Sequence, residues 1–213
     1  MEDFELSVEA MRARRSSKWR HYPEHVIPAW VADMDFAVAE PVQRALELLV
    51  RHGDYGYAWR AEEDSLASAF VARMRDRFDW APDPAGVYPI ADLVQAMVAT
   101  VIAFSEPGDG VAMQTPIYPP FISSVRDTSR RRVDNPLRDD GARYVLDVEG
   151  LRGAVDGGTR MIMVCNPHNP TGRVFERREL EAIGALAVER DLVVVCDEIH
   201  ADLIYPGSCH VPM

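Results

Sequence analysis

The chain has 213 residues, with 23 basic side chains, 34 acidic ones and a formal net charge of −11. Hydrophobic residues make up 47% and charged residues 27%, which is typical of a globular protein with a buried core and excludes a largely disordered chain. The acidic excess argues against nucleic acid or an anionic membrane as the main partner, since both bind concentrated positive charge.

Residues 1–38 show no sustained hydrophobic period, and we expect an N-terminal arm there. Glu40-Pro41 opens the first predicted helix, which carries an apolar stripe and ends at Gly53. A second amphipathic helix is predicted from about residue 62 to residue 78.

From Gly86 onward, short apolar runs alternate with helical ones. The runs at 161–165 and 192–196 are continuously apolar, which is typical of parallel strands covered on both faces. The fold class is therefore α/β, with a mainly parallel sheet and helices on both faces, in a domain spanning 39–213. Strands are predicted at 110–114, about 131–134, 160–165 and 192–196, and helices at 93–104, about 118–127, about 147–155 and 176–190.

The three cysteines favour a reducing compartment. Their number is odd, no Cys-x-x-Cys pair occurs, and Cys165 and Cys196 lie in apolar runs, so we expect buried thiols without disulfides. The N-terminal residues lack the layout of a signal peptide, and no apolar stretch reaches the roughly 18 residues of a membrane span. We expect a cytoplasmic protein.

Polar residues follow two of the predicted strands at the edge where parallel sheets bind ligands. Residues 166–172 (Asn-Pro-His-Asn-Pro-Thr-Gly) follow strand 160–165, and two prolines and Gly172 predict a rigid turn there. Taken alone, such a turn is also compatible with a simple strand-to-helix connection. Residues 87–92 read as a strand and turn before helix 93–104, whose free N–H groups could hold a phosphate.

A metal site is an alternative at the second of these strand ends. Asp197, Glu198, His200 and Asp202 offer carboxylate and imidazole groups, which are ordinary metal ligands. However, no His-x-His or His-x-x-x-His motif supplies further ligands, and the acids could instead start a helix. Motifs for dinucleotide binding, a P-loop or a nucleophile elbow are absent from the sequence.

The order of the motifs is more specific than any one of them. The chain carries Trp-Val-Ala-Asp-Met-Asp-Phe at 30–36, Thr-Pro-Ile-Tyr-Pro-Pro-Phe at 115–121, the turn 166–172, and Asp-Glu-Ile-His-Ala-Asp-Leu at 197–203. This series resembles the pyridoxal-phosphate enzymes of the class I/II aminotransferase fold (fold type I). Within that fold it is similar to the cystathionine β-lyase (cysteine-S-conjugate β-lyase) group.

The resemblance implies roles for four side chains. Asp197 would pair with the pyridine nitrogen of pyridoxal 5′-phosphate and keep it protonated, which the cofactor needs to act as an electron sink. Asn169 would hydrogen-bond the 3′-oxygen, Tyr118 would stack on the ring, and His200 would lie near the 3′-oxygen.

The resemblance also implies a phosphate site and a partner. Backbone groups of Ile90, Ala91 and Asp92 would bind the cofactor phosphate. Tyr57 would reach the phosphate of a neighbouring subunit, which implies a homodimer. The implied reaction is β-elimination from cystathionine or another sulfur-containing amino acid, giving pyruvate, ammonia and a thiol. An aminotransferase, or a non-catalytic protein that binds the cofactor or dimerises, is the alternative.

Lysine is the point at which the chain departs from this pattern. Of the 23 basic residues 22 are arginine, and Lys18 lies in a Ser-Lys-Trp motif that does not match the Schiff-base lysine. In the family that lysine follows the Asp-Glu-Ile-His segment by about thirty residues, so we assign no catalytic residue here. We therefore expect an N-terminal fragment that lacks the C-terminal small domain, exposes strand edges and is inactive alone.

Overall fold

The computed structural model describes residues 4–53, 55–56 and 65–213. The chain divides into two compact units, residues 1–61 and 62–213, which we describe separately. The predicted Tyr57 contact lies outside the described residues.

The first unit contains more regular structure than the sequence predicts. Helices α1 (Val8–Ala13) and α2 (Ser17–Arg20) lie in the segment expected to be irregular. Both are too short for a hydrophobic period to reveal them, and α1 is stabilised by its cap, because the Ser7 side chain accepts a hydrogen bond from the backbone N–H of Ala10. The predicted helix at residue 40 is confirmed as α3 (Glu40–His52), and Gly53 ends it with φ of +67°.

Lys18 is the centre of a compact polar cluster in this unit. Only 9% of the residue is exposed. Its Nζ donates to the backbone oxygen of Asp33 at 2.7 Å and to Oδ2 of Asp35 at 2.6 Å, and Trp19 Nε1 donates to Oδ1 of the same carboxylate at 2.7 Å. The lysine thus fixes the segment at 33–35 and has no exposed amine to offer a ligand.

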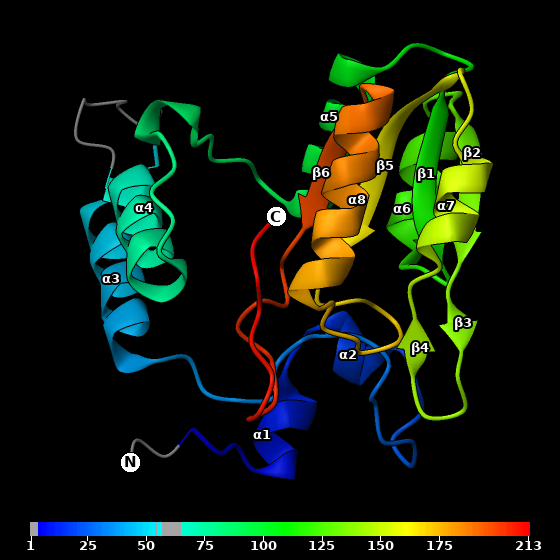
Figure 1. Ribbon diagram of the computed structural model, residues 1–213. Coiled ribbons are helices and arrows are strands. Elements are labelled where there is room, and N and C mark those ends of the chain that lie inside the picture. Colours follow the sequence, from blue (N-terminus) through cyan, green and yellow to red (C-terminus); the bar gives the residue numbers. More distant parts are fainter. Residues whose placement is uncertain (1–3, 54, 57–64) are drawn as a thin grey trace. The chain divides into compact units, whose positions relative to one another are not determined.

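The second unit is a three-layer α/β structure with a four-stranded parallel sheet in the order β2–β1–β5–β6. Helices α5 and α6 pack on one face of the sheet and α7 and α8 on the other (Figure 1). The strands are β1 (Gly110–Thr115), β2 (Arg131–Pro136), β5 (Thr159–Cys165) and β6 (Val193–Asp197). The helices are α4 (Ser65–Phe78), α5 (Leu93–Phe104), α6 (Pro119–Arg126), α7 (Val148–Ala154) and α8 (Arg177–Arg190), with a 3₁₀ turn at Pro84–Gly86.

Most of the predicted elements are confirmed, but three features differ. Residues 87–91 form no strand, because no strand of the described chain pairs with them. A small antiparallel hairpin, β3 (Arg138–Asp139) with β4 (Tyr144–Val145), was not predicted because two-residue strands carry no period. Strand β6 is only half-buried, since it forms the edge of the sheet, whereas β5 in the sheet interior is almost wholly buried.

The three cysteines are free thiols, as predicted, but only Cys165 is buried, whereas Cys196 is half-buried and Cys209 is exposed. Among the described residues, no helix combines the length and the apolar character that spanning a bilayer would require.

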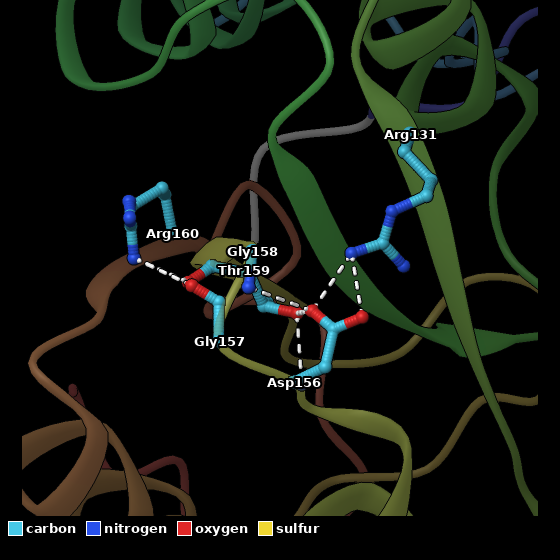
Figure 2. Close-up of polar contacts among 6 residues, drawn as sticks. All are labelled: Arg131, Asp156, Gly157, Gly158, Thr159 and Arg160. Carbon is cyan, nitrogen blue, oxygen red and sulfur yellow. Dashed lines mark hydrogen bonds and ion pairs between the residues drawn. The ribbon is translucent and has the colours of Figure 1, made fainter.

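The amino-terminal edge of the sheet is held together by Asp156. Figure 2 shows its carboxylate accepting hydrogen bonds from Arg131 Nη2 at 2.8 and 2.9 Å, from the Gly158 backbone at 3.1 Å and from Thr159 Oγ1 at 2.9 Å. These bonds, with that of Thr159 first, lower the pKa of the Asp156 carboxyl group. The strands β1, β2 and β5 all begin here, and Gly110 N donates to the Gly158 oxygen at 2.7 Å.

We predict that Gly110→Ala destabilises the protein. A Cβ at this position would lie 2.8 Å from Arg131 Nη2, 2.9 Å from Thr159 Oγ1 and 3.0 Å from the Thr159 Cα, so backbone as well as side chains must shift. The free energy of unfolding should fall by about 1–3 kcal/mol in urea titration. Gly157→Ala is the matched control, because its Cβ would meet nothing within 4 Å. Equal stability of the two variants would contradict the prediction.

Candidate functional site

The carboxyl ends of β5 and β6 bring the two polar motifs together. The strands pair in parallel with Cys165 opposite Asp197. Just beyond, the Asn166 backbone N–H donates to the Asp197 oxygen at 2.9 Å, and the Asn166 side-chain oxygen accepts from the backbone N–H of Phe175 at 2.9 Å. Asn166 is completely buried, so it joins the turn to β6 from within the structure.

The turn at 166–172 is closed by its own hydrogen bonds. His168 N donates to the Arg173 oxygen at 2.7 Å, and Gly172 N donates to the His168 oxygen at 2.8 Å. Gly172 has φ of +70°, a conformation that side chains with a Cβ adopt only with strain. The ring nitrogen Nδ1 of His168 lies 2.9 Å from Thr171 Oγ1. These bonds close the turn on itself, and they support the rigid turn that the sequence predicts.

Tyr118 and Asn169 lie side by side. Tyr118 precedes α6, and its backbone N–H donates to the Asn169 oxygen at 3.1 Å. Asn169 N in turn donates to Cys165 Sγ at 3.5 Å. Within the described part of the chain, neither the Asn169 side-chain amide nor the Tyr118 hydroxyl has a hydrogen-bond partner. Tyr118 is 38% exposed.

Asp197 ends β6 with one carboxylate oxygen engaged and one free. Oδ1 accepts from the Ile199 backbone N–H at 3.0 Å, while Oδ2 has no partner among the residues that the structure describes. Asp197 also lines a cavity of about 670 Å³ together with Leu93, the first residue of α5. The first residue of α5 therefore borders the same cavity as Asp197.

Asp92 caps the start of α5, since its Oδ1 accepts from Gln95 N at 2.8 Å. The backbone N–H groups of Ile90, Ala91 and Asp92 donate to no described residue, and these residues are exposed. Free N–H groups at a helix N-terminus suit an anion, because the helix dipole adds a positive partial charge.

Two other residues that the sequence suggests, His200 and Asp202, form no hydrogen bond with these groups in the described chain. The His200 side chain forms no hydrogen bond or ion pair with the other site residues in the described chain; its backbone oxygen accepts from Leu203 N at 2.8 Å. Asp202 is paired with Arg73 and Arg77 of α4. No three His, Cys, Asp or Glu residues of the described chain are placed to hold a metal ion, which removes support for the metal alternative.

A buried polar layer supports the turn, and sequence reasoning missed it. Arg173, nearly buried, forms an ion pair with Glu179 in the first turn of α8, and its guanidinium lies 5.7 Å from the Phe175 ring centroid. Burial raises the pKa of the Cys165 thiol to about 11, so this sulfur stays protonated beneath Asn169. In the sequence, the one signal for this buried layer is Arg173, a charged residue directly after Gly172.

We predict that His168 makes stability depend on pH. The residue is 1% exposed, and burial lowers the pKa of its imidazole from 6.5 to about 4. The unfolded chain binds this proton first as pH falls, so stability is full above about pH 6.5 and decreases down to about pH 4. The loss reaches ~3 kcal/mol, since each pKa unit corresponds to about 1.4 kcal/mol.

Urea unfolding of the native gene product between pH 7 and pH 4 measures this loss. His168→Gln should have a lower stability at pH 7 but a flatter dependence over that range, while the control His200→Gln should follow the wild-type curve. Parallel curves for wild type and His168→Gln would contradict the prediction.

Comparisons with known proteins show the family and the fold. The chain is 37% identical to cystathionine beta-lyase PatB of Bacillus subtilis strain 168, over 87% of this chain and 48% of that protein. It superposes on cystalysin from Treponema denticola with a TM-score of 0.90 and 30% identity, covering 100% of this chain and 55% of that one. It also superposes on N-succinyldiaminopimelate aminotransferase from Mycobacterium tuberculosis, with a TM-score of 0.77 and 32% identity over 82% and 46% of the two chains.

The chain therefore spans about half the length of the curated relatives it matches. The family model for aminotransferase class I and II matches residues 85–212, which include α5, the whole parallel sheet and both polar motifs. The chain belongs to the class I and II aminotransferase family.

Proposed function

We propose that this chain is part of a pyridoxal-phosphate-dependent carbon–sulfur β-lyase. The substrate would be cystathionine or another cysteine S-conjugate, and the products pyruvate, ammonia and a thiol. The observation that carries the proposal is the set of free groups at one edge of the sheet: an Asp197 oxygen, the Asn169 amide, the Tyr118 ring and the N–H groups before α5.

These groups fit the parts of pyridoxal 5′-phosphate. The free Asp197 oxygen can accept a hydrogen bond from a protonated pyridine nitrogen, and the Asn169 amide can donate to the 3′-oxygen. The Tyr118 ring offers a stacking face, and residues 90–92 offer phosphate donors. When bound, the cofactor supplies an electron sink for the carbanion left at the substrate Cα.

Relatives support lyase chemistry and keep one alternative open. PatB and the Corynebacterium glutamicum relative are named cystathionine beta-lyases, and the cystalysin structure contains pyridoxal 5′-phosphate. The M. tuberculosis structure is an aminotransferase with the same fold. Pyruvate and free thiol released from cystathionine without a keto-acid acceptor would favour the lyase, and turnover that requires such an acceptor would favour transamination.

We further propose a homodimer in which Tyr57 contributes to the phosphate site of the partner subunit, in a cytoplasmic setting. His200 is retained as a residue near the 3′-oxygen. Sedimentation of the native gene product with and without cofactor tests the dimer.

We predict that the 213-residue chain expressed alone releases no pyruvate from cystathionine. A lysine amine must bind the cofactor and move the Cα proton, and the only lysine of the chain is buried and bonded to Asp33 and Asp35. Borohydride reduction with pyridoxal phosphate, followed by peptide mass mapping, should leave Lys18 unmodified. Pyruvate release or a reduced adduct on Lys18 would overturn this expectation.

The intact mass of the native gene product tests whether that protein is long enough to contain the Schiff-base lysine. A mass well above the 23.9 kDa of this chain would leave room for it. A mass equal to 23.9 kDa would exclude the lyase and favour a non-catalytic, cofactor-binding protein.

We predict that Asp197→Asn in the native gene product slows pyruvate formation by roughly 10²–10³-fold, the range for loss of one preorganised electrostatic group. The amide cannot hold the pyridine nitrogen in its protonated form. Asp202→Asn is the matched control, because that carboxylate pairs with Arg73 and Arg77 at the surface. Similar rates for the two variants would contradict the assigned role of Asp197.

A further inference from the structure

The last residues of the chain lie against the candidate site although they form neither helix nor strand. His210 is only 2% exposed, and its ring lies 5.5 Å from that of Phe78 in an edge-to-face arrangement. Val211 packs against the apolar cluster under α7 and α8. A segment without regular structure buries side chains to this extent only where specific contacts hold it.

Three contacts tie this segment to the two polar motifs. The Glu198 carboxylate takes part in two of them: Oε2 lies 3.1 Å from Nε2 of His210, and Oε1 accepts from the Met213 backbone N–H at 2.9 Å. In the third, the Asn166 side-chain nitrogen donates to the Val211 oxygen at 3.5 Å. The segment 209–213, which we call the return segment, thus bridges the ends of β5 and β6.

Glu198 and Asp197 are neighbours with different surroundings. Arg73 and Arg77, the arginines of α4 that form ion pairs nearby, both pair with Asp202. Within the described chain, His210 is the basic side chain that approaches the Glu198 carboxylate, at 3.1 Å from Nε2, and neither of its ring nitrogens has a hydrogen-bond partner there. Glu198 therefore uses both its oxygens on the return segment, while Asp197 keeps one oxygen free for a ligand.

The end of β6 needs such support. Asp197 is the last residue of β6, and the described chain after it forms turns. Strand ends with few buried contacts open locally at low free-energy cost. Any opening there would move the Asp197 carboxylate, which must stay within hydrogen-bond distance of its ligand.

We propose that Glu198 and His210 are positioning residues: they hold the return segment across the ends of β5 and β6 and so keep Asp197 in place. The part of this inference that concerns cofactor binding rests on the proposed function. The anchoring itself does not, and it can be tested separately.

The alkylation rate of Cys196 measures how firmly the return segment is held. Cys196 directly precedes Asp197, is half-buried, and has its pKa raised by burial and by the adjacent Glu198. In the native gene product, His210→Leu should increase the rate of Cys196 alkylation roughly tenfold, because the contact with Glu198 is lost. His210→Gln, which keeps an N–H group near the position of Nε2, should restore slow labelling. Fully buried Cys165 and exposed Cys209 serve as unreactive and reactive controls.

Cofactor affinity tests whether the anchoring acts through Asp197. Titration with pyridoxal phosphate should show roughly tenfold weaker binding for His210→Leu, and similar weakening for Glu198→Leu. In an Asp197→Asn background the same substitutions should cause little further loss. A general structural defect would instead weaken binding equally in both backgrounds.

The outcomes separate the two proposals. Wild-type Cys196 labelling in His210→Leu, or equal loss of affinity in both backgrounds, would overturn the positioning role. If the wild-type protein binds no pyridoxal phosphate, the proposed function fails, and Cys196 labelling alone decides the anchoring. Glu198→Gln, which retains the acceptor for Met213, provides a milder variant if the leucine substitutions unfold.

Discussion

The parallel pairing of β5 with β6 is the constraint on which the candidate site depends. Register places Cys165 opposite Asp197, and the buried Asn166 continues the pairing one step past the end of β5. A shift by one residue would turn Asp197 to the other face of the sheet and separate it from the turn that carries Asn169. The hydrophobic side chains of the two strands, packed between two helical layers, maintain this register.

Polar groups at this edge divide into those that hold the structure and those that remain free. Asn166 and Glu198 bond to backbone groups, whereas His168 places Nδ1 beside Thr171 and leaves its buried Nε2 without a partner in the described chain. Asn169 and Asp197, their close neighbours in sequence, keep unpaired atoms. Burying a polar group costs free energy unless the group is hydrogen-bonded. Asn166 and Glu198 therefore gain stability from their bonds, and the unpaired atoms of Asn169 and Asp197 must face solvent or a ligand.

Much of this arrangement could be predicted from sequence, and the physical reason is periodicity. Strands β1, β5 and β6 and helices α5 and α8 were found because their apolar patterns are long. The rule that ligands bind at the carboxyl ends of parallel strands then placed Asn169 and Asp197 at the same edge. Their roles toward a cofactor came from resemblance, since spacing alone also fits an ordinary turn.

The remaining features depend on contacts between residues distant in sequence. Lys18 bonds to Asp35, Arg173 lies beneath its own turn, and His210 returns to Glu198. No local pattern marks such partners, because each depends on a fold that must already exist. The hairpin at 138–145 and the helices α1 and α2 were missed for a simpler reason, their shortness.

The burial of Lys18 has a practical consequence for spectroscopy. Pyridoxal phosphate is an aldehyde and condenses with exposed amines on most protein surfaces, which produces a background absorbance unrelated to any site. In this chain the single lysine has its amine bonded to a carboxylate and a carbonyl, and every other basic side chain is a guanidinium or an imidazole. Imines with lysine side chains should therefore be few, and once the α-amino group is blocked, a stoichiometric absorbance change on adding the cofactor can be read as occupancy of a defined site.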